Sequence, residues 1–256
     1  MSKRIPAIMN LFESQEFWTV AQMSNELGVS QMTIRRDFDE LEARKLIRRL
    51  HGGAVAVKTQ NNEPFYDDRA NAFVEEKRKI ALVASKMIRD NSVIAIDSGS
   101  TCFELVKLIQ KRRLTVVTNS FRGIGGLLFS DNIKVVVPCG ILRSHEGSIS
   151  GPDAVSYLSK LHVDQFFMGV GGIDSNAGFT DYSLDDVAVK KMIISNASEV
   201  ITLADSSKFN RVTFANICQA TEVDKLICEI RPVGKLNDYL QRSGVEVIIS
   251  DVMEEI

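Results

Sequence analysis

The spacing of apolar residues over the first 57 positions predicts three helices followed by two short strands. Ile5, Ile8, Met9 and Phe12 stand at helical intervals, which predicts an amphipathic helix over residues 3–16. Two more helices follow. Their buried sides are expected to consist of Val20, Met23 and Leu27 in the first of these and Ile34, Phe38 and Leu41 in the second.

Local signals mark where the elements begin and end. Thr19 and Ser30 each precede one of the two later helical repeats, and a hydroxyl oxygen there can accept a hydrogen bond from the first turn of the helix. Gly28 separates the two helices. The apolar runs at 46–50 and 54–57, with two glycines between them, predict a hairpin.

This order of elements is that of a winged helix-turn-helix domain, expected over residues 1–57 with the motif at 20–39. Because the apolar side of the third helix faces the core, its polar side is left for a DNA duplex, with the first turn at the base edges. Arginine suits bidentate contact with guanine or phosphate. The residues expected to contact DNA are Ser30, Gln31, Met32, Thr33, Arg35 and Arg36 in the helix and Arg49, His51 and Gly52 in the hairpin.

A solvated basic helix is the alternative for this surface. From Thr33 to Arg49 there are six Lys and Arg residues against four Asp and Glu, an excess too small to identify a DNA-binding surface by charge alone. The helix-turn-helix spacing is therefore what favours DNA binding.

Residues 58–72 are polar, interrupt the periodicity and are expected to form a linker. A second, larger domain is expected over residues 73–256, beginning with a long helix at 73–89. The expected strands are 93–96, 115–117, 133–137, 165–170, 200–203, 225–228 and 245–249, and the other expected helices are 101–111, 121–129, 153–161, 184–197 and 233–243. This alternation predicts an α/β fold with a mostly parallel sheet and helices on both faces.

Polar residues follow several of these strands, at the carboxyl ends where open parallel sheets bind ligands. They are Asp97, Ser98, Gly99, Ser100 and Thr101 after the first strand, Thr118, Asn119 and Ser120 after the second, Gly171 and Gly172 after the fourth, with Lys190 in the helix beyond, and Asp205 to Lys208 after the fifth. Gly99 and the start of the following helix can hold a phosphate or a carboxylate.

Each of these residues also has a purely structural interpretation. Ser100, Thr101 and Ser120 could cap helices, and Ser183 with Asp186 has the spacing of a capping box. The two glycines could form a plain loop, and the lysines could be surface charges. The convergence of three polar strand ends on one edge favours a ligand site. No Walker A motif and no G-x-G-x-x-G after a strand is found, which disfavours a nucleotide.

Composition excludes several classes of protein. Of 256 residues, 45% are hydrophobic and 25% charged, with a formal net charge of −2, so the chain is an ordinary globular protein rather than a disordered or uniformly basic one. Neither a signal peptide nor a membrane-spanning run is expected, and no two cysteines form a C-x-x-C pair, so we expect a cytoplasmic protein with reduced thiols. The three histidines are scattered, and we expect neither a metal site nor a cofactor.

Residues 19–38, with the core Thr33-Ile34-Arg35-Arg36-Asp37, and the hairpin turn Arg49–Ala54 resemble the DNA-binding part of DeoR-type bacterial transcriptional regulators. The resemblance implies that the third helix reads an operator. The segments that resemble the sensor domain of this family are 97–101, 118–120, 169–174, 178–180, 189–191 and 204–209. The resemblance covers Lys3 to about Pro232.

The resemblance also implies a sensor fold related to ribose-5-phosphate isomerases and CoA transferases, which binds a phosphorylated sugar or similar metabolite and so alters operator affinity. The roles expected on this basis are phosphate binding for Ser98 to Thr101, hydroxyl binding for Asp97, Asn119 and Asp205, and charge neutralisation for Lys190 and Lys208. Cys139-Gly140 stands where the family usually has two glycines, so Gly140 is the expected ligand contact of that pair.

An isomerase-like enzyme with a DNA-binding appendage is the competing interpretation. Isomerisation needs a positioned acid and base. The isomerase counterparts of Met168–Ile173 resemble D-G-A-D-E, but methionine and glycine stand at the acidic positions here and cannot transfer protons. Asp97, Asp174 and Asp205 remain as carboxylates, yet we expect no catalytic residues and no enzyme. The polar strand ends disfavour a third interpretation, a DNA-binding scaffold without an effector.

We therefore expect a transcription regulator, a repressor of a carbohydrate-utilisation operon rather than an activator. Its expected partners are operator double-stranded DNA and a phosphorylated sugar, with no membrane partner. Paired operator half-sites require paired recognition helices, so we expect a homo-oligomer, a dimer or a tetramer. The linker would carry the effect of the ligand to the DNA-binding domains.

Overall fold

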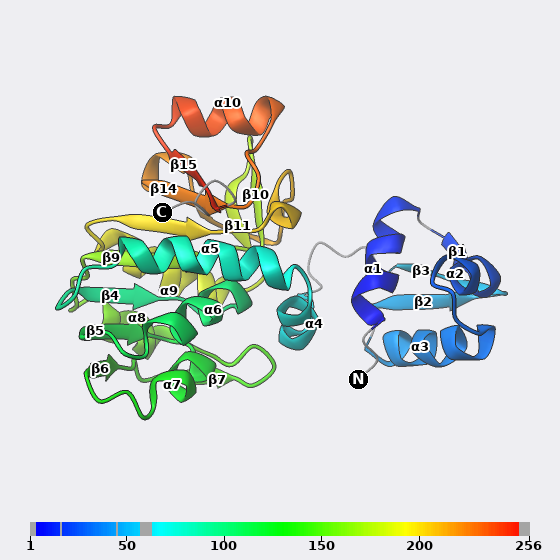
Figure 1. The fold of residues 1–256 in the computed structure, drawn as a ribbon, viewed down its shortest axis with the longest axis horizontal. Coiled ribbons are helices and arrows are strands. Elements are labelled where there is room, and N and C mark those ends of the chain that lie inside the picture. The colour runs from blue at the N-terminus through cyan, green and yellow to red at the C-terminus, as the bar shows by residue number, and fades with distance from the viewer. Residues whose placement is uncertain (1–3, 16, 45, 57–62, 251–256) are drawn as a thin grey trace. The chain divides into compact units, whose positions relative to one another are not determined.

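A computed structural model of the chain describes residues 4–15, 17–44, 46–56 and 63–250. The chain divides into two compact units, residues 1–72 and residues 73–256 (Figure 1). Each unit has its own hydrophobic core. Within the described residues no helix has the length and apolar character needed to cross a membrane.

The first unit contains the predicted helices and hairpin. Its elements are α1 (Ile5–Ser14), β1 (Phe17–Thr19), α2 (Val20–Glu26), α3 (Gln31–Ala43), β2 (Ile47–Leu50), β3 (Gly53–Ala56) and α4 (Tyr66–Asn71). Strand β1 was not expected, and it adds to the hairpin as a third antiparallel strand, in the order β1-β3-β2. Three residues are too few to show a strand period in the sequence.

The capping signals in this unit are confirmed. The hydroxyl of Thr19 accepts the amide of Gln22 at 3.1 Å, and the Gln22 side chain returns to the Thr19 amide at 3.0 Å. Ser30 accepts the amide of Thr33 at 3.2 Å. The predicted apolar faces meet in one core, whose fully buried members include Ile5, Ile8, Phe12, Met23, Ile34, Phe38 and Leu41.

The segment expected as a linker differs from the prediction, because residues 66–71 within it form helix α4. This helix packs against α1 in the first unit. Arg44, the C-cap residue that follows α3, contacts Asp68 of α4 at 3.3 Å and lies over the ring of Phe65, with 5.3 Å between the guanidinium carbon and the ring centroid. The polar composition of the segment concealed a helix that is held by tertiary contacts.

The second unit is built on a parallel sheet of seven strands in the order β15-β14-β12-β9-β4-β5-β6. The strands are β4 (Val93–Ile96), β5 (Leu114–Thr118), β6 (Ile133–Val136), β9 (Gln165–Gly169), β12 (Val200–Leu203), β14 (Lys225–Cys228) and β15 (Glu246–Ile249). All seven were predicted, and the expected α/β fold with a parallel sheet is confirmed. The strand order reverses direction between β4 and β9, the switch point at which such sheets open a crevice for ligands.

Helices cover both faces of this sheet (Figure 1). They are α5 (Val74–Met87), α6 (Ser100–Ile109), α7 (Phe121–Leu127), α8 (Pro152–Leu158), α9 (Leu184–Ser195) and α10 (Gly234–Arg242). Phe167 packs with residues of α5 and α6, whereas its neighbours Phe166 and Met168 pack with residues of α8, α9 and α10. Because successive strand residues point to opposite faces, the two clusters are the two sides of one sheet.

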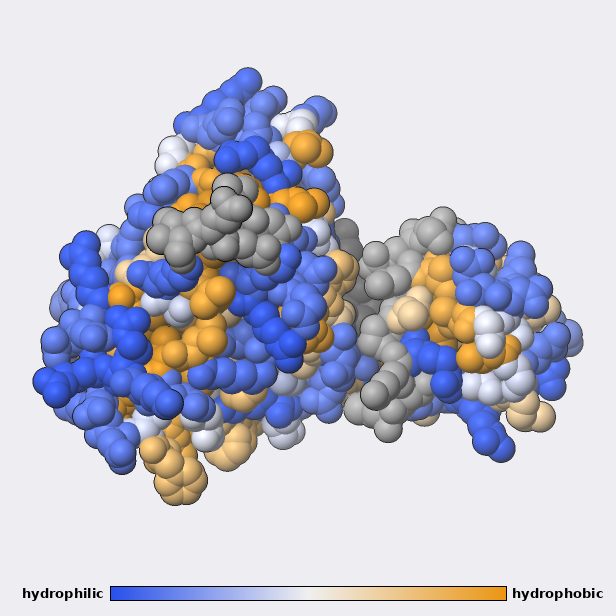
Figure 2. Space-filling model, viewed as in Figure 1, coloured by the Kyte–Doolittle hydropathy of each residue, from blue (hydrophilic) through white to orange (hydrophobic). Residues whose placement is uncertain are grey.

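Five short strands of the second unit were missed. They are β7 (Ile141–Arg143) and β8 (Ser148–Ser150), which form a hairpin, and β10 (Gly172–Asp174), β11 (Gly178–Asp181) and β13 (Ala215–Cys218), which form a small antiparallel sheet. On the outer surface, apolar side chains gather near α7 (Figure 2), where Phe121, Leu128 and Phe129 are exposed.

Candidate functional site

Helix α3 presents a polar face to solvent. Ile34, Phe38 and Leu41 point into the core and Asp37 is buried beside them, so the opposite face of the helix points outward. Its exposed side chains include Gln31, Met32, Arg35 and Arg36, while Thr33 is half-buried. Arg35 and Arg36 form no ion pair with any residue that the structure describes, so both guanidinium groups remain available to a partner.

Ser30 and Thr33 are partly used by the helix itself. Besides accepting the Thr33 amide, the Ser30 hydroxyl lies 2.9 Å from the Thr33 hydroxyl. Ser30 thus fixes the first turn of α3 and sets the direction in which Gln31 and Met32 project. When the Thr33 hydroxyl is the donor of this pair, the Ser30 hydroxyl hydrogen remains available for the expected DNA contact.

The hairpin arginine is held against α3. The Nη1 atom of Arg49 lies 2.6 Å from a carboxylate oxygen of Asp39, and its guanidinium lies over the ring of Phe38. Asp39 and Phe38 therefore position the guanidinium of Arg49, and its expected contact with the DNA backbone stays a prediction. His51 and Gly52 lie in the exposed turn between β2 and β3.

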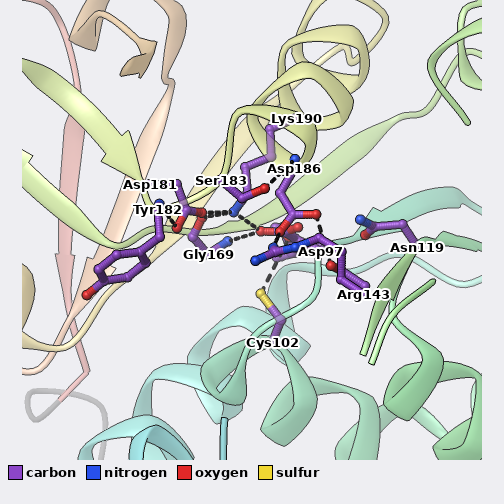
Figure 3. A network of polar contacts seen from close by, with 12 residues as sticks. Asp97, Cys102, Asn119, Arg143, Gly169, Asp181, Tyr182, Ser183, Asp186 and Lys190 are labelled. Carbon is purple, nitrogen blue, oxygen red and sulfur yellow. Dashed lines mark hydrogen bonds and ion pairs between the residues drawn. The ribbon is translucent and has the colours of Figure 1, made fainter. Parts of the chain in front are cut away.

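A buried polar cluster lies at the switch point of the second unit (Figure 3). Asp97 follows β4, and its Oδ2 atom accepts the amide of Gly169 at the end of β9 at 3.0 Å. Lys190 of α9 contacts Asp97, the Oδ2 of Asp181 at 2.8 Å and the carbonyl oxygen of Gly169 at 2.6 Å. Strands β4, β9 and β11 and helix α9 are thus joined through one ammonium group.

The electrostatics of this cluster keep Lys190 charged. Burial lowers the pKa of Lys190, but the carboxylates of Asp181 and Asp97 more than offset burial and hold this pKa above its ordinary value. Burial raises the pKa of Asp97 to about 6, against the opposing effect of Lys190. Lys190 was expected to neutralise a ligand, but its charge is instead matched by two carboxylates of the protein.

A second ion pair ties the β7–β8 hairpin to α9. Arg143 at the end of β7 contacts Asp186, whose other oxygen accepts the Ser148 hydroxyl at 2.9 Å. Burial raises the pKa of Asp186, opposed by Arg143. Ser183 caps α9 as expected by accepting the Asp186 amide, but the Asp186 side chain turns to Arg143 instead of completing a capping box.

Sequence analysis missed Asp181, Arg143 and the role of Asp186 in this cluster. One signal was present, since Asp186 and Lys190 stand four residues apart and so lie on one side of a helix. The partners Asp181 and Arg143 lie on the short strands that were not predicted.

The N-terminus of α6 offers unoccupied backbone donors beside Asp97. Gly99 precedes the helix with φ of 135°, a conformation that favours glycine, and no side chain caps the first turn. Ser98, Ser100 and Thr101 are largely buried around it. Backbone N–H groups and hydroxyls at a helix start form an arrangement suited to a phosphate.

In the loop after β5, two side chains stabilise the start of α7 and a third has an acceptor atom without a partner in the described part of the chain. Thr118 accepts the amide of Ser120 at 3.1 Å, and Ser120 accepts the amide of Gly123 at 3.0 Å, so both side chains stabilise the start of α7. Asn119 lies between them with 2% of its surface exposed. Its amide group donates to the Ile149 carbonyl at 3.3 Å, and its Oδ1 atom has no hydrogen-bond partner among the described residues.

The remaining predicted residues lie around this edge with contacts of their own. A Cβ atom at Gly172 would stand 2.3 Å from the Arg211 carbonyl oxygen, and one at Gly171 would stand 2.9 Å from the Tyr182 ring. Close packing of the chain therefore accounts for both glycines. Gly140 packs on β8, where a Cβ would stand 2.5 Å from the Ser150 carbonyl oxygen.

Asp205 and Lys208 lie at the end of β12. Asp205 is fully buried, accepts the Ser207 amide at 3.2 Å and stands 3.7 Å from the ammonium of Lys77 in α5. Lys208 ends the short 3₁₀ turn Ser206–Lys208. Asp205 thus caps this turn and stands close to a buried lysine, while its Oδ2 atom has no hydrogen-bond partner among the described residues. In the described part of the chain no group of His, Cys, Asp or Glu is arranged for a metal ion.

A winged helix-turn-helix unit followed by a parallel α/β unit defines the class of this protein as a two-domain DNA-binding regulator. The family model described as the DeoR C terminal sensor domain matches residues 72–229, and the DeoR-like helix-turn-helix domain matches residues 4–60. The chain belongs to the DeoR family of transcriptional regulators, which confirms the resemblance found in the sequence.

The curated relatives are named as regulators. The glycerol-3-phosphate regulon repressor of Escherichia coli (strain K12) is 30% identical over 90% of this chain and 92% of its own length. The HTH-type transcriptional repressor GlcR of Bacillus subtilis (strain 168) is 31% identical over 97% of this chain and 96% of its own. These names agree with the expectation of a regulator rather than an enzyme.

Two solved structures match the chain at lower sequence identity. Ribose 5-phosphate isomerase A from Methanocaldococcus jannaschii matches 54% of this chain and 55% of its own, with 20% identity and a TM-score of 0.41. The full-length sorbitol operon regulator SorC from Klebsiella pneumoniae matches 97% of both chains, with 12% identity and a TM-score of 0.40.

Proposed function

We propose that this chain is a cytoplasmic repressor of a carbohydrate-utilisation operon, whose affinity for operator DNA changes when a phosphorylated sugar binds to the α/β unit. The uncapped start of α6 beside two buried acceptor groups at the switch point is the observation that carries the ligand part. Membership of the DeoR family carries the DNA part.

On the DNA side, α3 is proposed to enter the major groove. Gln31, Met32, Arg35 and Arg36 supply the groups that read or hold the duplex, and the exposed turn at His51 and Gly52 lies toward the backbone or minor groove. Paired half-sites require two copies of α3, so the active form is proposed to be a dimer or a tetramer.

On the ligand side, the amides of residues 99–102 and the hydroxyls of Ser98, Ser100 and Thr101 are proposed to hold the phosphate. Asp97 and Asn119 are proposed to bind sugar hydroxyls. Two facts about relatives support this class of ligand. The matched domain is described as a sensor domain, and the Escherichia coli relative is named for the glycerol-3-phosphate regulon.

The segment 58–72 is proposed to transmit the effect of the ligand. It joins the two units covalently, and its helix α4 contacts the end of α3 through Asp68 and Arg44. A ligand alters operator affinity only if it binds the DNA-competent and DNA-incompetent arrangements unequally.

Arg35→Ala tests the DNA part. We expect the dissociation constant for an operator duplex to rise about 5- to 150-fold, equivalent to ~1–3 kcal/mol, because a bidentate contact to a base is lost. The probe is a duplex selected from a random pool by the parent protein, and binding is measured by fluorescence anisotropy at fixed salt. Arg242→Ala, which removes one exposed positive charge from α10, serves as the matched control. Equal affinity of Arg35→Ala and the parent would remove Arg35 from the interface.

A further inference from the structure

The polar cluster at the switch point has its cations already in use (Figure 3). Lys190 contacts Asp97 and Asp181, and Arg143 contacts Asp186. These contacts join two cationic and three carboxylate side chains, all largely removed from solvent. A further carboxylate brought by a ligand close to Lys190 and Arg143 would meet the carboxylates that already pair with them, and like charges in a poorly solvated site repel strongly.

Several buried side-chain oxygen atoms around this edge have no hydrogen-bond partner among the described residues, and two of them belong to the residues that follow β4 and β5. These two are Oδ1 of Asp97 and Oδ1 of Asn119, and each residue is 2% exposed. The other oxygen of Asp97 already accepts from Gly169 and Lys190. One N–H of the Asn119 side chain donates to the Ile149 carbonyl, and the Oδ1 atom accepts no hydrogen bond from the described residues. Both of these open Oδ1 atoms accept hydrogen bonds and donate none.

The start of α6 supplies the opposite chemistry a few residues away. The backbone N–H groups of its first turn are donors without a side-chain cap, and they follow Asp97 in the chain by three to five residues. The start of α6 therefore offers N–H donors and the positive end of the helix dipole. Asp97 and Asn119 offer two acceptor atoms in negatively charged surroundings. A matching ligand carries an acceptor-rich anion at one end and hydrogen-bond donors a short distance along.

We infer that this site takes a phosphate ester whose carbon chain carries hydroxyl or amino groups, and that it rejects the corresponding phosphorylated sugar acids. The inference rests on the proposed function, because it concerns the ligand of the same site. A hydroxyl satisfies the open oxygens of Asp97 and Asn119, and an ammonium group also gains from the surrounding carboxylates. A carboxylate in the same place leaves both oxygens unpaired and adds a third acceptor.

Matched ligand pairs test the inference directly on the full-length protein. Glycerol 3-phosphate differs from 3-phosphoglycerate, and glucose 6-phosphate from 6-phosphogluconate, in the replacement of a hydroxyl-bearing end by a carboxylate. Glucosamine 6-phosphate carries an amine in place of the 2-hydroxyl of glucose 6-phosphate. Affinities are measured by isothermal titration calorimetry, with inorganic phosphate as reference. We expect the hydroxyl or amino compound to bind at least about 10-fold more tightly than the acid in every pair in which either member binds.

The outcomes distinguish a failure of this inference from a failure of the proposed function. An acid that binds as tightly as its hydroxyl counterpart overturns the inference and leaves the phosphate end intact. Failure of all five esters and of inorganic phosphate to bind overturns the proposed ligand class and the inference with it.

Substitutions at Asn119 test whether this residue sets the preference for hydroxyl or amino compounds over acids. Asn119→Asp adds a carboxylate, so the preference for glucosamine 6-phosphate over glucose 6-phosphate should increase about 10-fold. Asn119→Leu removes the acceptor and should reduce the preference for the hydroxyl compounds over the acids. Asn132→Asp, an exposed position before β6, is the matched control and should leave both ratios unchanged. Thermal unfolding midpoints identify variants that have lost the fold, and unchanged ratios in both folded Asn119 variants contradict the inference.

Discussion

Replacing Lys190 by methionine is expected to lower the free energy of unfolding of the α/β unit by about 3–5 kcal/mol. The ammonium group of Lys190 is the contact that matches the buried carboxylates of Asp97 and Asp181. Without it, the two buried carboxyl groups lose their counter-charge, and each must either stay ionised in a poorly solvated site or take up a proton. The loss follows from these unmatched charges and not from packing, because methionine is apolar and has nearly the length of lysine.

The measurement is urea denaturation of the full chain followed by two signals. Trp18 is the single tryptophan and lies in the first unit, so its fluorescence reports that unit, while far-ultraviolet circular dichroism reports both units. Lys191→Met, at the exposed neighbouring position on α9, is the matched control. Adding Asp97→Asn and Asp181→Asn to Lys190→Met should recover part of the lost free energy of unfolding, because the unmatched carboxylates are then removed. A Lys190→Met protein within about 1 kcal/mol of the parent would show that the cluster does not stabilise the unit.

Ser100→Glu is expected to abolish the response of DNA binding to phosphorylated sugars while leaving DNA binding itself within about 2-fold of the parent. Ser100 opens α6 and has 9% of its surface exposed, so a carboxylate there faces the same backbone amides that are proposed to hold the phosphate. It satisfies those amides itself and repels the incoming anion. The readout is the ratio of operator dissociation constants with and without the tightest-binding ester of the matched pairs.

Two further variants accompany this experiment. Ser100→Ala removes only the hydroxyl, and ligand affinity should fall by about 5- to 10-fold, equivalent to ~1–1.4 kcal/mol. Ser156→Glu, at an exposed position of α8, adds the same charge away from the site and should respond like the parent. A normal response in folded Ser100→Glu protein means that the phosphate binds elsewhere.

The sequence predicted the large elements because each one carries its own signal. The seven long-sheet strands are short apolar runs between helical repeats, and Thr19 and Ser30 mark helix starts by local hydrogen bonds. The short strands β7, β8, β10, β11 and β13 have three or four residues and no clear alternation, so no local pattern identified them. Helix α4 was concealed for a different reason, since it is stabilised by contacts with α1 and Arg44.

The candidate site was likewise predictable from the sequence in part. Parallel topology alone brought Asp97, Gly99 and Asn119 to one edge, as predicted. The pairing of Asp97 with Lys190 spans 93 residues of sequence, and no local pattern shows that the lysine is already matched. Likewise, the contact of Arg49 with Asp39 depends on how the hairpin packs against α3. Residue type and strand position therefore indicated where the site is, while its charge balance required the tertiary contacts.

The most direct test of the account is the affinity of the full-length protein for its selected operator duplex, measured with and without phosphorylated sugars at fixed salt. The account predicts that at least one hydroxyl-bearing ester changes the dissociation constant by about 5- to 150-fold, the usual range of coupling between two sites. It also predicts that the same ester, at the same concentration, changes nothing in Ser100→Glu protein. An operator affinity that is the same with every ester, in protein that binds one of them by calorimetry, would contradict the claim that ligand binding controls DNA binding.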